Sequence, residues 1–226
     1  MVFRELSFPI PTKLKLQTYE MSCAVSGHGN VTKRLKSGPM VIYYLKGIIM
    51  QHNKPIDLLG FGNTIVDIEY RVDEALLNTL GIAKGSMTLI DLNQKQTIMN
   101  QLPQPVHKCS GGSVANSLYA ASLFGLNTYH LGVIGTDDLA EFSKNDYESN
   151  NIQHSFNELG VNGDSGCCLV LITPDGERTM LTYLGVSSAF KLNNHFEAII
   201  PQATILFIEG YLLADDNVFD LLKNTI

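Results

Sequence analysis

Short apolar runs that alternate with segments of helical spacing dominate the chain from residue 56 onwards. Residues 56–62 form the first such run and end in glycines, and similar runs occupy residues 127–137 and 203–211. Segments of helical spacing lie at residues 72–80, 93–102, 113–124, 138–150 and 215–223. Strands that alternate with helices are typical of an α/β domain with a parallel sheet. We therefore predict an α/β fold whose parallel sheet contains strands near Ile56, Tyr129 and Ile205.

Two other stretches have the pattern of β-strands. Residues 65–70 alternate, with Asp67 and Glu69 on one face and apolar side chains on the other. A Pro-Asp-Gly turn separates the β-rich runs 166–172 and 178–184, which predicts a hairpin. The alternation places Asp67 on the polar side of a half-buried strand, where most acidic residues are simply solvated.

Two glycines, Gly111 and Gly112, precede a run without helix breakers that is rich in Ala, Leu and Ser. This pattern predicts a loop that opens into a buried helix, with Ser113 as a candidate cap. Glycines let a ligand approach the backbone closely, and Asn116, one turn later, offers a donor and an acceptor to the same place. A tight turn that only packs a core helix is the alternative that these residues leave open.

Composition narrows the possible partners. The chain has 226 residues, 45% of them hydrophobic and 17% charged, and a net charge of −6, as in a globular protein with a full core. The acidic balance predicts no nucleic-acid partner, and no apolar run approaches the ~20 residues of a membrane span. The four cysteines lack metal-ligand spacing, so we expect reduced thiols and a cytoplasmic location.

Residues 1–49 differ from the rest of the chain, with seven basic residues and two acidic ones. They show no sustained helical or alternating period, although residues 41–50 are a candidate for a short strand or helix. We therefore predict an N-terminal extension outside the fold over residues 1–49 and a domain over residues 50–226, with Met50 as a candidate natural start.

The glycine segment Gly-Gly-Ser-x-x-Asn-Ser at residues 111–117 resembles the first sugar-binding segment of the ribokinase-like (PfkB) carbohydrate kinases, in its adenosine-kinase form. Residues 60–67, Gly-Phe-Gly-Asn-Thr-Ile-Val-Asp, resemble the end of that family's first strand, where the Asp binds sugar hydroxyls. A carboxylate suits this task because it accepts hydrogen bonds from two neighbouring hydroxyls. Further segments in family order lie at residues 132–137, 173–180 and 209–213, so the resemblance covers residues 55–226.

The resemblance implies a ribokinase-like three-layer αβα core with a parallel sheet, covered by a small β-sheet lid. It also implies ATP-dependent phosphorylation of the hydroxymethyl group of a sugar or ribonucleoside, first of all adenosine. The expected acceptor-binding residues are Asn63, Asp67, Gly111, Gly112 and Asn116. A homodimer through the lid is a further expectation, and Asp137 is expected to cap a helix.

The family's general base is an Asp in an Asp-x-x-Gly-Ala-Gly-Asp segment, which does not occur before Ile226. We therefore expect a kinase fold truncated before its C-terminal half and inactive alone, with no catalytic residue and no ATP or Mg²⁺ site in this chain. A non-catalytic sugar- or nucleoside-binding module is the alternative. A dinucleotide-binding oxidoreductase fits less well, because its fingerprint needs a third glycine where Ile65 stands.

Overall fold

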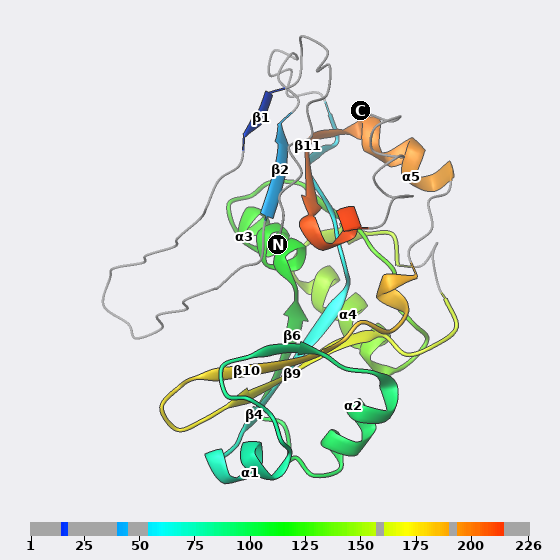
Figure 1. Cartoon of the computed structure of the whole chain (residues 1–226). Coiled ribbons are helices and arrows are strands. Elements are labelled where there is room, and N and C mark those ends of the chain that lie inside the picture. Colours follow the sequence, from blue (N-terminus) through cyan, green and yellow to red (C-terminus); the bar gives the residue numbers. More distant parts are fainter. Residues whose placement is uncertain (1–14, 18–39, 45–53, 157–160, 190–193, 215–226) are drawn as a thin grey trace.

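The computed structural model describes residues 15–17, 40–44, 54–156, 161–189 and 194–214, which form two sheets with helices around them (Figure 1). The larger sheet has the strand order β1 (Lys15–Gln17), β2 (Met40–Tyr44), β11 (Ala203–Glu209), β3 (Ile56–Phe61), β7 (Thr128–Leu131) and β8 (Ile152–His154). The smaller sheet has the order β5 (Met87–Leu89), β10 (Arg178–Tyr183), β9 (Gly166–Ile172), β4 (Ile65–Arg71) and β6 (His107–Gly111). The α-helices are α1 (Glu74–Thr79), α2 (Leu92–Met99), α3 (Ser113–Leu123), α4 (Asp138–Ser149) and α5 (Asn194–Ile199). Short 3₁₀ turns occupy Gly185–Ser188, Ile200–Gln202 and Gly210–Ala214.

The larger sheet is the centre of a three-layer core. Its strands β11, β3, β7 and β8 are all parallel, as predicted for the strands near Ile56, Tyr129 and Ile205. Leu206 and Ile208 of β11 pack with Phe196 of α5 on one face, whereas Phe207 packs with Val114 of α3 on the other. A strand that is buried on both faces is typical of such a parallel sheet. The predicted α/β class and αβα core are confirmed.

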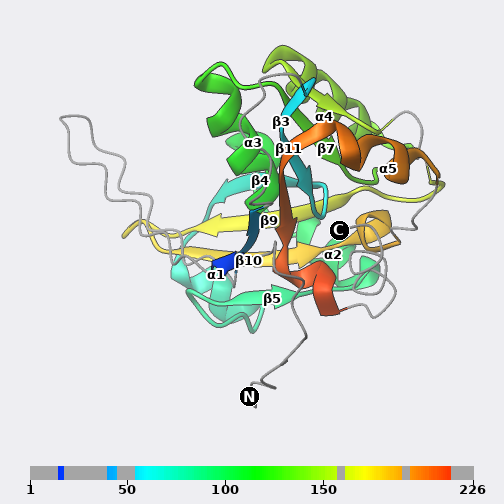
Figure 2. The same cartoon turned by 90° about the horizontal axis from the view of Figure 1, so that it is seen from above.

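The smaller sheet is the predicted lid. It is mixed, because β4 runs parallel to β9 and antiparallel to β6. The apolar residues of the β4 alternation, among them Val66 and Ile68, are buried against Leu77 of α1. Asp67 and Glu69 lie on the opposite face. In Figure 1 the lid lies below the larger sheet, with α1 and α2 beneath it, and Figure 2 shows β9 and β10 from above. The lid helices therefore cover one face and leave the other open towards the core.

Two strands of the N-terminal stretch join the edge of the larger sheet. β2 pairs antiparallel with β11, from Met40 opposite Glu209 to Tyr43 opposite Leu206, and β1 pairs with β2. Strand β2 largely coincides with residues 41–50, where a short strand or helix was a candidate, whereas β1 was not expected. The division into an extension over residues 1–49 and a domain over residues 50–226 stays a prediction. The helix expected over residues 215–223 lies outside the described residues.

The sequence pattern missed several short elements. β6 is rich in polar residues and β8 has only three residues, so neither has a clear alternation. Both are defined by their partners, since β6 pairs with β4 and β8 with β7. Among the described residues, no helix combines the length and the apolar character that a membrane span requires.

Candidate acceptor-binding site

Two glycine-containing turns meet where the lid joins the core. The first is the turn between β3 and β4, which contains Asn63, and the second joins β6 to α3. Because β4 and β6 are antiparallel, with Ile65 opposite Gly111, Asp67 lies over the end of β6. A side chain at Gly111 would overlap the Asp67 carboxylate. The structure thus brings Asp67 and Gly111 into direct contact, and glycine is required there by space.

Gly112 begins helix α3 without a side-chain cap. Its φ of 91° lies in the region that favours glycine, and it is the N-cap residue of α3. The expectation that Ser113 caps this helix is wrong, because Ser113 is already the first helical residue. Its Oγ instead donates a hydrogen bond to Oε1 of Glu209, over 3.0 Å.

Asn63 is buried beside the same turn. Its carbonyl oxygen lies 3.4 Å from the position that a Cβ on Gly112 would occupy. Its backbone N–H donates to Oε2 of Glu209 over 2.8 Å. Within the described residues its side-chain Oδ1 is buried and accepts no hydrogen bond, which leaves an acceptor for another group.

Asn116 lies one turn into α3. Its backbone N–H donates to the Gly112 carbonyl over 3.1 Å, and its side chain is exposed. Asn63, Asp67, Gly111 and Gly112 therefore converge, whereas Asn116 stands beside them on the exposed face of the helix.

Glu209 is the residue that sequence reasoning missed at this site. It is the last residue of β11 and is buried. It is charged, whereas five of the six residues before it in the strand are apolar or small. An acidic residue that closes an apolar strand was the available signal, because carboxylates are rarely buried without partners.

A buried histidine supports the first turn from behind. His130 of β7 is fully buried, with Nε2 3.3 Å from the Gly62 carbonyl and Nδ1 2.7 Å from the Tyr147 hydroxyl. Since a carbonyl only accepts, Nε2 carries the proton and Nδ1 accepts from Tyr147. Burial lowers the pKa of His130 to about 4, so the ring is neutral at pH 7. Burial likewise raises the pKa of Tyr147 above its ordinary value, which keeps its hydroxyl protonated.

Two thiols flank Asp67 in the lid. The strand register places Cys109 of β6 on one side and Cys168 of β9 on the other. Burial raises the pKa of Cys168 to about 12, and the nearby Asp67 carboxylate adds to the shift. The adjacent Cys167 packs into the opposite face, as expected for neighbours along a strand. Cys168 is therefore a protonated thiol.

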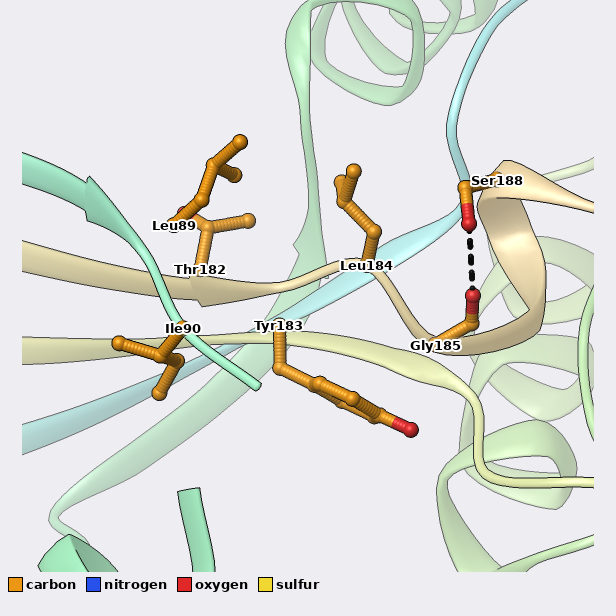
Figure 3. Close-up of a pocket in the computed structure, with 7 residues that line it drawn as sticks. All are labelled: Leu89, Ile90, Thr182, Tyr183, Leu184, Gly185 and Ser188. Atoms are coloured by element: carbon orange, nitrogen blue, oxygen red, sulfur yellow. Dashed lines mark hydrogen bonds between the residues drawn. The ribbon is translucent and has the colours of Figure 1, made fainter. Parts of the chain in front are cut away.

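A pocket of about 250 Å³ lies on the lid in the same cross-strand row as Asp67 (Figure 3). The register aligns Asp67 with Cys168, Cys168 with Thr182, and Thr182 with Leu89. Leu89, Thr182 and Leu184 project from one side of the strands, and Ile90 and Tyr183 from the other. Neighbouring strands are about 4.8 Å apart, so Thr182 is about 10 Å from Asp67 along this row.

The glycine turn of this site does not fit the phosphates of ATP. The glycine turn at the start of α3 faces the carboxylates of Asp67 and Glu209, which would repel the phosphates of a nucleotide. None of the described side chains form a group of three or more His, Cys, Asp or Glu residues suited to a metal ion. We therefore derive no step through ATP or a metal.

Two alternative roles for nearby residues are settled by their surroundings. Asp137 caps α4 by accepting from the Ala140 N–H over 3.0 Å, as expected, and its other contacts are with Ser165. Gly60 at the end of β3 and Gly62 just after it lead into strand β4, whereas a dinucleotide-binding turn leads directly into a helix. These glycines therefore do not form the dinucleotide-binding turn of the oxidoreductase alternative.

Comparison with known proteins places these observations in a family. Residues 80–223 match the family described as pfkB family carbohydrate kinase. The chain is 25% identical over 162 residues to guanosine-inosine kinase of Escherichia coli (strain K12), and the aligned region covers 69% of this chain and 37% of that protein. It is 26% identical over 168 residues to adenosine kinase 2 of Arabidopsis thaliana, covering 69% of this chain and 47% of that protein.

The structure resembles that of adenosine kinase from Sinorhizobium meliloti, with a TM-score of 0.66 and 27% identity over 76% of this chain and 52% of that one. The chain thus spans about half the length, or less, of these relatives. The family match covers more than half of the chain, and the two-sheet fold is consistent with it. The chain belongs to the pfkB family of carbohydrate kinases.

Proposed function

We propose that the chain binds the acceptor of a nucleoside kinase, a ribonucleoside whose hydroxymethyl group the whole enzyme phosphorylates with ATP. The observation that carries this proposal is the cross-strand row that links Asp67 to the lid pocket. A carboxylate at one end and a pocket of mixed polar and apolar lining about 10 Å away match a molecule with a hydroxyl-rich sugar and a flat base.

The sugar is proposed to lie at the two glycine turns. The Asp67 carboxylate can accept from two neighbouring hydroxyls, and the backbone groups of Gly111 and Gly112 are within reach because neither residue has a side chain. The unsatisfied Oδ1 of Asn63 can accept a further hydroxyl. Asn116 would bind from the exposed face of α3.

The base is proposed to lie on the open face of the lid. Leu89 and Met87 are 61% and 48% exposed there, two residues apart on the same face of β5. A planar base would cover them, and the Thr182 hydroxyl offers a polar group within the same pocket. The names of the relatives, guanosine-inosine kinase and adenosine kinase, support a purine.

Calorimetric titration of the 226-residue chain tests this function. Adenosine, inosine and guanosine are compared with ribose and fructose, and 2′-deoxyadenosine removes one hydroxyl. We expect one purine ribonucleoside to bind most tightly and the deoxy analogue to bind about tenfold more weakly, as for one hydrogen bond to a charged group. Equal affinity for the ribo- and deoxynucleoside would contradict the proposal.

Activity of this chain alone is a separate part of the proposal. Because, among the described residues, the glycine turn of the site faces the carboxylates of Asp67 and Glu209 and not cations, we expect adenosine binding without adenosine-dependent ATP turnover. Turnover that is lost in Asp137→Ala would contradict this and make Asp137 a catalytic base. If a longer form of this protein, as long as its relatives, also bound adenosine without ATP turnover, a non-catalytic binding module would be favoured.

Assembly and location complete the proposal. A homodimer through the lid would have to use the open face or an edge strand, because α1 and α2 cover the other face. Cytoplasmic location is supported by the thiols of Cys167 and Cys168, which are buried and not in a disulfide.

A further inference from the structure

Glu209 is a buried carboxylate that the proposed function does not use. It is 6% exposed, and none of the ion pairs among the described residues includes it. Burying a carboxylate without a cation is costly unless hydrogen bonds to the charged oxygens compensate. Its retention at the end of β11 therefore calls for a specific role.

Both carboxylate oxygens of Glu209 are bound by the two turns of the acceptor site. Oε2 accepts from the Asn63 N–H over 2.8 Å, and Oε1 accepts from the Ser113 hydroxyl over 3.0 Å. Gly62 makes room for this arrangement, because a Cβ there would lie 2.9 Å from Oε2. One side chain thus joins three segments that are far apart in the sequence.

The carboxylate also lies beside the N-terminus of α3, where it accepts from the hydroxyl of Ser113, the first helical residue. Gly112 is the N-cap of the eleven-residue helix α3 and offers no side chain to its free N–H groups. A negative charge beside a helix N-terminus is favourable, and this offsets part of the cost of burying Glu209. The first residue of α3 is therefore tied to the end of β11.

We propose that Glu209 is a positioning residue of the acceptor site, which fixes the spacing between the Asn63 turn and the Gly112–Ser113 turn. Asn63, Gly111 and Gly112 are held in register by this one carboxylate, so Glu209 acts through them and does not itself touch the ligand. The identity of the ligand rests on the proposed function, whereas the link that Glu209 makes between the two turns does not depend on it.

Three variants separate positioning from other roles. In Glu209→Gln, Oε1 can still accept from the Asn63 N–H, and Nε2 can donate to the Ser113 hydroxyl, which accepts as readily as it donates. Glu209→Ala removes both hydrogen bonds. Ile208→Ala is the matched control, because Ile208 is the preceding buried residue of β11 and packs into the core cluster of the α5 face.

Adenosine affinity is the first readout. We expect Glu209→Ala to raise the Kd at least about tenfold and Glu209→Gln to stay within about threefold of the wild type. Ile208→Ala should lower the thermal midpoint but leave the Kd unchanged. If Glu209→Gln weakens binding as much as Glu209→Ala, the charge itself is required and the positioning role is overturned.

Amide hydrogen exchange is the second readout and needs no ligand. We expect the Asn63 amide and the first-turn amides of α3 to exchange at least about tenfold faster in Glu209→Ala, and as in the wild type in Glu209→Gln and Ile208→Ala. An Asn63 amide that stays protected in Glu209→Ala overturns the inference. If the wild type binds no nucleoside, the proposed function fails, and the exchange result alone decides the role of Glu209.

Discussion

At the junction of the two sheets, the available space, the backbone conformation and burial each restrict which residue can occupy a position. Gly111 is needed because the Asp67 carboxylate occupies the volume of a side chain, whereas Gly112 is needed because its φ is 91°. His130 is neutral because it is fully buried between Gly62 and Tyr147. These are three different physical requirements, and each predicts a different result on substitution.

Gly111→Ala tests the space requirement. The new methyl group would displace the Asp67 carboxylate, so we expect the Kd for adenosine to rise about tenfold or more in a folded protein. Gly125→Ala is the control, because Gly125 has a φ of 80° and nothing within 4 Å of a Cβ. It should cost about 1 kcal/mol of stability and leave the Kd unchanged. Equal Kd values for Gly111→Ala and the wild type would refute the role of this contact.

His130 predicts a pH-dependent stability. Its pKa is lowered from 6.5 to about 4 in the folded state, so the unfolded chain binds the extra proton between these values. Stability is therefore complete above pH 6.5 and falls as the pH is lowered towards 4, by up to about 3 kcal/mol. Urea unfolding at several pH values measures this, with His130→Phe as the comparison. A variant whose stability falls as steeply as that of the wild type would contradict the assignment.

Secondary-structure elements place these residues, and the longer ones were predictable. The β4 alternation and the Pro-Asp-Gly hairpin predicted strands β4, β9 and β10, which the family resemblance placed in a lid, and the apolar runs predicted β3, β7 and β11. β6 was missed because it is polar and held by β4, and Ser113 was misassigned as a cap because the partner of its hydroxyl, Glu209, comes from a distant strand. Both features depend on contacts between segments that are far apart in the sequence, and such contacts leave no pattern in the local sequence.

The N-terminal strands give a test at the level of elements. β2 covers the outer edge of β11 from Leu206 to Glu209, whereas β1 pairs only with β2. We expect deletion of residues 1–39 to change the thermal midpoint by no more than about 2 °C, and deletion of residues 1–49 to lower it by several degrees. No change in either deletion would support a domain that begins at Met50.

At the scale of the whole molecule, the chain combines a three-layer core with a lid, and the proposed acceptor site lies at their junction. The sequence resemblance predicted Asn63, Asp67, Gly111 and Gly112 there but not Glu209, and family membership is established by comparison. The row from Asp67 to the lid pocket could not be read from the sequence, because it depends on the register of four strands.

The most direct test of the acceptor site is the adenosine affinity of Asp67→Ala, measured by calorimetry. We expect a loss of roughly 1.5–3 kcal/mol, or about 10- to 150-fold in Kd, as for hydrogen bonds to a charged group. Asp73→Ala is the matched control, because Asp73 only caps α1 beyond the end of β4. It should lose about 1 kcal/mol of stability and keep its affinity. An unchanged Kd in Asp67→Ala would return Asp67 to the role of a solvated strand residue and contradict the proposed site.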